Sequence, residues 1–368
     1  MKPFDIKKLS SALAKKNSNI QLGFTDPKVW ISTGNYALNY RISSDFFKGF
    51  PLEGKMTLIA GESSTGKSYL ASGNVVRWCQ QNGVTVFIFD TERAIDNKWI
   101  RALGVDPEAD NVTKYNISLI DDITSTLMEI LKQYKEAYLD ADPEDRPPIL
   151  IDIDSLGMAT TATEIKHAED GQNKGDMGLK QKQLFNMCRT FLASVGEMPI
   201  GMICTQHTYA SQDIYKPDSI ISGGSSLEFT PSVVIAMKKK KMKEDDQGKK
   251  LDEVAGVHVS AVVRKSRYGK PYQEVEFNIP YDTGMNPYSG LFELFTESLK
   301  MDGRFVLTKA GAYVDYVDPN GEVVFHKYRS KITNEDYDRI MKDFMDYTTK
   351  HPHEDVSVSP ESSEEGAE

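Results

Sequence analysis

The chain has 368 residues, of which 39% are hydrophobic and 27% are charged, a composition typical of a globular protein with more than one domain. No apolar stretch approaches the roughly 18 residues that a membrane span requires, and the charged N-terminus lacks the apolar segment of a secretory signal. The net charge of −10 argues at first against nucleic acid as a partner. Residues 351–368 hold six acidic residues and no lysine or arginine, so overall charge does not decide the partner.

The first 280 residues predict an α/β protein. Residues 4–16 favour a weak amphipathic helix, and a loop-like stretch follows to residue 27. Apolar strands then alternate with helices: strands at 55–60, 84–90, 149–154 and 199–205, helices at 68–81, 123–138 and 179–195. Strands that are almost continuously apolar and alternate with helices indicate a mostly parallel sheet covered on both faces.

The pattern changes after residue 230. Strands at 232–237, 256–264 and 273–279 follow one another without long helices, as in a β extension on one side of the sheet. Residues 283–350 predict a small α+β domain, with a helix at 291–300, two strands around the turn at 318–321 and a helix at 333–349. The acidic end, 351–368, is predicted to be a disordered tail. The three cysteines form no CxxC pair and are predicted to be buried thiols of a reducing compartment.

One motif carries a specific chemistry. Residues 61–68 read GESSTGKS, which fits the phosphate-loop pattern GxxxxGK[ST], and the motif follows a predicted strand and opens a predicted helix. The loop is expected to bind a nucleotide through backbone N–H groups, Lys67 to reach the β- and γ-phosphates, and Ser68 to bind Mg²⁺. The predicted nucleotide-binding residues are Gly61, Glu62, Ser63, Ser64, Thr65, Gly66, Lys67, Ser68 and Tyr69.

Polar residues at the ends of three other strands are expected to face the same ligand, because a parallel sheet collects its carboxyl ends at one edge. Asp154 ends an apolar strand and is the preferred Mg²⁺-linked carboxylate; Asp152, two residues earlier on the same strand face, either shares that role or is structural. Glu92 could activate the water that attacks the γ-phosphate, and Gln206 could sense that phosphate.

These elements resemble the RecA-type homologous-recombination ATPases, and in particular their bacteriophage UvsX-like branch, over roughly residues 30–300. The resemblance implies a RecA-like P-loop ATPase core. The stretches that carry it are ISTG at 31–34, GESSTGKS at 61–68, DTERAIDNKWIRALGVD at 90–106, DIDSLGMA at 152–159, GDMGLK at 175–180, ICTQHTY at 203–209, GGSSLEF at 223–229, RKSRYGKPY at 264–272 and NPYSGL at 286–291.

The resemblance implies a role for each matching position. Glu92 matches the catalytic glutamate, Asp154 the Mg²⁺-linked aspartate and Gln206 the γ-phosphate sensor. Trp99 falls where the family places an aromatic ring against adenine, with Asp96 three residues before it. Lys265 and Arg267 match two lysines that reach the ATP of the neighbouring subunit; arginine at 267 keeps the charge but changes the geometry.

The resemblance also implies that two long polar segments, 158–178 and 211–230, are the DNA-binding loops. Neither loop is strongly basic, so backbone contacts and modest counterion release are expected to bind DNA of any sequence. Two readings of the run Lys238–Lys241 stay open, a solvated face and a contact to duplex DNA. The predicted DNA-binding residues are Lys166, Lys174, Lys216, Gly223, Gly224 and Ser225.

The expected function is an ATP-dependent DNA recombinase that forms a helical filament on single-stranded DNA and exchanges strands with a double-stranded partner, using Mg²⁺. Residues 1–30 are expected to be an oligomerisation segment and 31–282 the ATPase core. The alternatives are an accessory paralogue without significant turnover and another ATPase of the RecA superfamily. A phage mediator protein and a single-stranded-DNA-binding protein are expected partners, and the cytoplasm, that of the host if the chain is phage-encoded, is the expected location.

Overall fold

The computed structural model describes residues 4–16, 26–138, 140–171, 178–210, 219–250, 252–281 and 283–352. Most of the predicted acidic tail, as well as Lys174 and Lys216, lies outside these ranges. The helices are α1 (Ile6–Lys16), α2 (Tyr36–Ser43), the π-helix η1 (Tyr69–Val75), α3 (Val76–Gln81), α4 (Asn97–Ala102), α5 (Ile120–Tyr138), η2 (Pro143–Asp145), η3 (Leu156–Met158), α6 (Ala162–Glu169), α7 (Leu179–Val195), α8 (Ser225–Phe229), α9 (Leu291–Glu297), η4 (Arg329–Lys331) and α10 (Asn334–Lys350).

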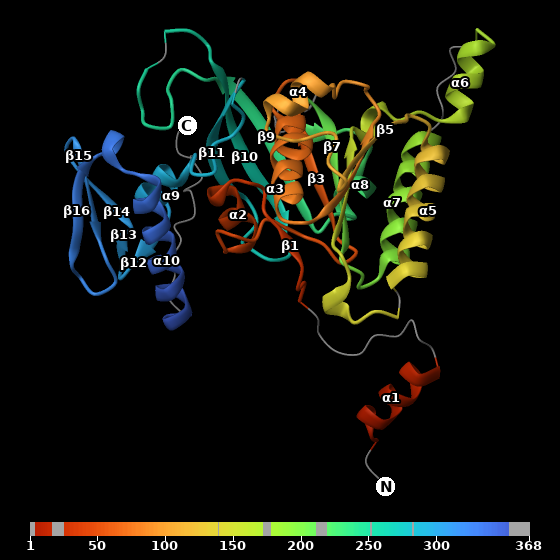
Figure 1. The fold of residues 1–368 in the computed structure, drawn as a ribbon, viewed down its shortest axis with the longest axis horizontal. Helices are drawn as coiled ribbons and strands as arrows, with labels where there is room; N and C mark the ends of the chain where they lie inside the picture. The colour runs from red at the N-terminus through yellow and green to blue at the C-terminus, as the bar shows by residue number, and fades with distance from the viewer. Residues whose placement is uncertain are drawn as a thin grey trace, which may run out of the picture.

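A nine-stranded sheet forms the centre of the molecule (Figure 1). Its order is β11-β10-β9-β3-β7-β6-β4-β5, and β8 pairs with β7 off this path. Neighbouring strands from β9 to β5 are parallel, whereas β10, β11 and β8 pair in antiparallel fashion. The strands of this sheet are β3 (Met56–Gly61), β4 (Thr85–Asp90), β5 (Val112–Asn116), β6 (Ile149–Asp154), β7 (Ile200–Ala210), β8 (Ser219–Ile221), β9 (Val233–Lys241), β10 (Gly256–Ser266) and β11 (Gln273–Pro280).

Three smaller sheets complete the structure. One joins two short segments before the phosphate loop, and the other two belong to the C-terminal region, where three antiparallel strands lie beside α10 (Figure 1). Their strands are β1 (Trp30–Ile31), β2 (Phe50–Pro51), β12 (Lys300–Met301), β13 (Arg304–Phe305), β14 (Leu307–Ala310), β15 (Tyr313–Val317) and β16 (Val323–Tyr328).

Alternation along the central strands explains the two layers of helices. In β3 the side chains of Met56, Leu58 and Ala60 belong to the hydrophobic cluster shared with α5 and α7, whereas Ile59 joins the cluster on the opposite face. That opposite face is covered by η1, α3 and α2. Because side chains alternate between the faces of a strand, Asp152 and Asp154 of β6 both lie on the side of η1.

The structure confirms the predicted α/β fold with a β extension, and it adds elements that the sequence did not predict. The helix predicted at 179–195 has those bounds, and the predicted strand at 199–205 continues as β7 to Ala210. Part of the first predicted DNA-binding loop is helical, a correction to its reading as irregular chain. Thr161 caps α6 and exchanges hydrogen bonds with Glu164, a capping box that satisfies backbone donors at the helix start.

The C-terminal region is packed against the core. Ring contacts join Tyr40 and Phe46 of the core to Phe344 of α10 and Phe295 of α9, and one hydrophobic cluster runs across residue 282. The predicted boundary there stays a prediction.

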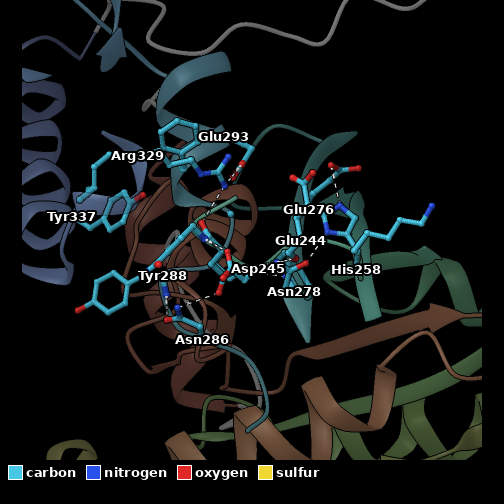
Figure 2. A pocket seen from close by; sticks show the side chains of 18 of the residues that line it. Glu244, Asp245, His258, Glu276, Asn278, Asn286, Tyr288, Glu293, Arg329 and Tyr337 are labelled. Atoms are coloured by element: carbon cyan, nitrogen blue, oxygen red, sulfur yellow. Dashed lines mark hydrogen bonds and ion pairs between the residues drawn. The ribbon is translucent and has the colours of Figure 1, made fainter. Parts of the chain in front are cut away.

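A network of hydrogen-bonded polar side chains lies beside this contact (Figure 2). Asp246 lies in the turn between β9 and β10, and its carboxylate accepts hydrogen bonds from Asn278, Asn286 and Ser289. The backbone carbonyl of Asp246 accepts another from Arg329. Arg329 also pairs with Glu293 at 2.8 Å. Hydrogen bonds therefore connect the turn after β9 to the C-terminal region.

The described helices include none with the length and apolar content that crossing a bilayer requires.

Candidate nucleotide site

The phosphate loop joins the end of β3 to the start of η1. Ser64 and Gly66 have φ angles of 59° and 89°, so left-handed backbone occurs twice within the loop. Residues in this conformation turn successive N–H groups toward one side and create a concave anion-binding surface. A Cβ on Gly66 would lie 2.6 Å from Ile279 Cδ1, and one on Gly61 would lie 2.7 Å from the Met237 carbonyl oxygen. Gly61 is therefore required by the close approach of the Met237 backbone, and Gly66 by its left-handed backbone conformation.

Lys67 is held inside the loop. Its Nζ donates to the carbonyl oxygens of Gly61 at 3.0 Å and Glu62 at 2.8 Å. Burial lowers the pKa of Lys67, while the nearby carboxylates of Asp154 and Glu92 act in the opposite direction. The site therefore combines a buried ammonium with two carboxylates, an arrangement that suits a phosphate group together with a divalent cation.

Two carboxylates of β6, which are two residues apart on one face of the strand, lie beneath the start of the helical segment. Asp154 accepts hydrogen bonds from the hydroxyls of Ser68 and Thr205. Asp152 accepts one from Ser72 Oγ at 2.6 Å. Ser68 thus joins the loop to Asp154, which is the pair expected to hold Mg²⁺. Burial is the main reason why the pKa of Asp154 is raised.

Asp152 has a different environment. Its side chain is fully buried, and its Oδ1 lacks a hydrogen-bond partner among the described residues. Burial raises its pKa to about 8, and the negative charges of Asp154 and Asp90 add to the shift. A structural role, as a mostly protonated hydrogen-bond partner of Ser72, fits these contacts.

Asp152 makes the stability of the nucleotide-free protein depend on pH. Its folded-state pKa lies above the ordinary value of 3.8, so the folded chain binds this proton more tightly, and the stability it gives is lost as pH rises from about 4 to about 8. Asp152→Asn removes this titration. We expect the free energy of unfolding of the variant, relative to wild type, to rise across that range in urea titrations with EDTA. Asp110→Asn, at an exposed position, is the control. If the difference in free energy of unfolding between variant and wild type did not change with pH for either variant, the raised pKa of Asp152 would be contradicted.

Glu92 lies beside these groups. Its Oε1 accepts a hydrogen bond from Ser155 Oγ at 2.7 Å and is 3.4 Å from His207 Nε2. Thr91 and Ser155 are tied by two hydrogen bonds, between the Thr91 hydroxyl and the Ser155 backbone. The ends of β4, β6 and β7 are thus linked, and Glu92 is oriented by two side chains from neighbouring strands.

Gln206 connects this edge to the second predicted DNA-binding segment. The side chain is 1% exposed, and its Nε2 donates to the carbonyl of Ser222 at 2.9 Å. Ser222 follows β8, which pairs with the part of β7 beyond Gln206. A Cβ on Gly223 would lie 3.2 Å from Gln206 Nε2. A movement of Gln206 would therefore be transmitted directly to the backbone of residues 222–223.

A cavity of about 400 Å³ adjoins the loop. Trp99 and Tyr69 meet there edge to face, with ring centroids 5.3 Å apart, and Tyr281 lines the same space. Asp96 acts as the N-cap of α4, accepting from the Trp99 backbone N–H at 2.8 Å, and so fixes the start of the helix that carries Trp99. An apolar cavity with aromatic walls beside a phosphate loop has the shape and chemistry to hold a nucleobase.

Lys265 and Arg267 lie away from this cavity. The backbone N–H of Arg267 donates to the Ser232 carbonyl, and Ser232 in turn donates to Met56 at the start of β3, whereas the phosphate loop begins at the end of that strand. At about 3.3 Å per residue, the two levels are roughly 16 Å apart along β3, further than an arginine side chain extends. Lys265 Nζ donates to the Phe229 carbonyl at 2.6 Å, and the Phe229 side chain is 72% exposed.

Several residues of the site were missed by sequence reasoning. Tyr281 follows a strand that was predicted, and recognising that β11 ends at the same edge of the sheet as β3 would have placed it. Ser155, Thr205 and His207 adjoin residues that were chosen, but their contacts with Asp154 and Glu92 depend on strand register, which spacing along the chain does not reveal.

A sequence model of the RecA N-terminal domain matches residues 6–286. The chain belongs to the RecA family. The "Recombination and repair protein" of Enterobacteria phage T4 is 25% identical over 318 residues, covering 84% of this chain and 74% of that protein. "Protein RecA" of Fusobacterium nucleatum is 28% identical over 328 residues, covering 88% and 77%, and "Protein RecA" of Helicobacter pylori is 26% identical over 294 residues, covering 78% and 74%. The match to the phage T4 protein supports the resemblance of the chain's motifs to the phage branch of the RecA family.

Proposed function

We propose that the protein is an ATP-dependent DNA recombinase, which assembles as a helical filament on single-stranded DNA and exchanges strands with a homologous duplex. The observation that carries the proposal is the placement of two cations far from the chain's own phosphate loop. Arg267 is level with Met56, at the opposite end of β3 from residues 61–68, and Lys265 is level with Leu58, so a second copy of the chain can present its nucleotide to them. Each site is then completed by two protomers, and turnover depends on assembly.

The residues around the loop fit Mg²⁺ and ATP. Ser68 and Asp154 would hold the metal ion, which when bound neutralises phosphate charge; the loop and Lys67 would hold the phosphates, and Trp99, Tyr69 and Tyr281 the base. Glu92, oriented by Ser155 and His207, accepts a proton from the attacking water at a carboxylate oxygen. Gln206 responds to the γ-phosphate and passes that response to Ser222.

DNA binding is assigned to the two segments that follow β6 and β7. Lys166 lies on α6, while Gly223 and Gly224 have φ angles of 102° and 80° and let the backbone approach a phosphate closely. Ser225 opens α8. The exposed apolar side chains of Phe4 and, in α1, of Ile6, Leu9 and Leu13 support the proposal that residues 1–30 join protomers. Duplex DNA as pairing partner, a mediator protein, a single-stranded-DNA-binding protein and a cytoplasmic location belong to the same proposal.

The decisive experiment combines electron microscopy with an ATPase assay. We expect helical filaments on single-stranded DNA with a non-hydrolysable ATP analogue, and ATP hydrolysis that requires single-stranded DNA. Filaments without hydrolysis would instead identify an accessory paralogue. Hydrolysis that ignores DNA, from a protein that stays monomeric, would point to another ATPase of the superfamily.

A further inference from the structure

The lysine run at the end of β9 has two chemically different faces. Gly61 at the end of β3 pairs with Met237, so Lys238–Lys241 extend beyond β3 and stand beside the phosphate loop. Lys239 and Lys241 pair with Val259 and Val257 of β10. Val257 lines the nucleotide cavity, and Val259 lies near Gly66, so this face of the extension is the nucleotide face.

The opposite face carries the other two lysines. Lys238 and Lys240 pair with Ser260 and His258, and Lys240 Nζ lies 3.5 Å from Glu276 Oε1. His258 and Glu276 line the pocket beside the C-terminal region (Figure 2). The adjacent residues Lys239 and Lys240 therefore contact different neighbours, Ser63 of the phosphate loop and Glu276 of β11, which the sequence alone could not show.

Lys239 contacts the phosphate loop itself. Its Nζ donates to the carbonyl oxygen of Ser63 at 2.5 Å. Lys67 occupies the carbonyls of Gly61 and Glu62 from inside the loop. Three consecutive carbonyls of the loop are thus held by two ammonium groups, one from the motif and one from β9.

This contact has a geometric consequence for the loop. A peptide unit is planar and trans, so the N–H of one residue points away from the carbonyl of the residue before it. Holding the Ser63 carbonyl toward β9 therefore turns the Ser64 N–H to the other side. Ser64 lines the nucleotide cavity and has the left-handed φ of 59° that helps to make an anion-binding concavity.

The contact also has an electrostatic consequence. The ammonium groups of Lys67 and Lys239 donate to the carbonyls of two neighbouring loop residues, Glu62 and Ser63, so two positive charges are held against one short segment and repel each other. A polyphosphate bound between them would relieve that repulsion. Both consequences favour an anion in the loop.

We propose that Lys239 is a positioning residue of the phosphate site, which acts in cis on nucleotide affinity by orienting the 63–64 peptide and adding positive charge. The inference rests on the proposed function, since it concerns the same nucleotide site. It separates Lys239 from the adjacent Lys238 and Lys240: Lys239 serves nucleotide binding within one chain, and the other two lie on the opposite face of β9.

The test compares Lys239→Gln with Lys238→Gln in the full chain without DNA, using calorimetric titration with ADP, a non-hydrolysable ATP analogue and inorganic tripolyphosphate. We expect Lys239→Gln to weaken binding of the two triphosphate probes about tenfold, as loss of a charge-assisted hydrogen bond would. Lys238→Gln, on the other face, keeps wild-type affinity, and Lys239→Arg recovers most of the loss. In DNA-stimulated hydrolysis, KM rises for Lys239→Gln while kcat is retained.

Two results would overturn the inference. Equal nucleotide affinities for the two glutamine variants would remove Lys239 from the site, and a loss confined to oligonucleotide binding would assign it to DNA instead. Thermal unfolding of each variant checks that the fold is intact. If wild-type protein bound none of the three probes, the proposed function itself would fail, and that result is distinguishable because it precedes any substitution.

Discussion

Replacing Lys265 with alanine is expected to reduce DNA-dependent ATP hydrolysis by about a thousandfold, as loss of a cation that stabilises the transferring phosphoryl group in trans does in other phosphoryl-transfer enzymes. The side chain lies beyond reach of the chain's own phosphate loop. Nucleotide binding by the isolated protomer should therefore be unchanged, because that site contains none of the lost charge. The measurement is steady-state hydrolysis on single-stranded DNA, with nucleotide affinity determined separately without DNA.

Mixing two inactive variants gives the sharper form of this test. Lys265→Ala lacks the cation but keeps Glu92, whereas Glu92→Gln keeps the cation. In a random co-filament about a quarter of the interfaces join an intact Glu92 to an intact Lys265 across the two chains, so a comparable share of activity should return. If each protomer used its own Lys265, the mixture would stay inactive.

Arginine at 267 calls for a milder expectation. Arg267→Lys keeps the positive charge but replaces the planar guanidinium by a single ammonium. We therefore expect its kcat to fall only modestly below the wild-type value, and the kcat of Arg267→Ala to fall much further. Lys270→Ala, on the exposed turn between β10 and β11, is the matched control for general loss of charge at this end of the sheet. An effect at Lys270 as large as that at Arg267 would indicate a diffuse electrostatic contribution instead.

The sequence predicts those parts of the structure whose residues are adjacent in the chain or follow a regular hydrophobic period. The phosphate loop is contiguous, and its strand–loop–helix setting was predictable from residues 55–81 alone. The strands of the parallel sheet were predictable because they are buried on both faces and therefore almost continuously apolar. Short elements such as α4, β5 and α8 were missed, since five or six residues hold too few repeats to set a period.

The limits are clearest where two strands meet. Asp152 and Asp154 were both candidates for the metal, and the sequence placed them on one face but not beneath Ser72 and Ser68. The lysine run shows the same limit: alternation divides it into two faces, but only the register with β3 and β10 decides which face meets the phosphate loop. Register comes from hydrophobic burial of the whole sheet, which no local pattern contains.

Glu92→Gln is expected to lower the rate of hydrolysis by about a hundred- to ten-thousandfold, because the amide cannot accept a proton from the attacking water. The substitution keeps the size of the side chain and leaves an acceptor for Ser155 Oγ, which now donates to Glu92 at 2.7 Å. Nucleotide and DNA binding should therefore survive. Hydrolysis and filament lifetime are measured together on single-stranded DNA with ATP, and Glu108→Gln, at a carboxylate that is 75% exposed, is the control.

Filament lifetime makes this outcome specific to catalysis. If ATP bound between protomers stiffens the assembly, a chain that binds ATP but cannot hydrolyse it stays on DNA, so Glu92→Gln filaments should persist in ATP as wild-type filaments do with a non-hydrolysable analogue. Loss of both hydrolysis and assembly would assign Glu92 to the structure of the site. Glu92 contacts His207, where β7 extends toward the second predicted DNA-binding segment. This alternative outcome is therefore measurable, because DNA affinity without nucleotide would then fall as well.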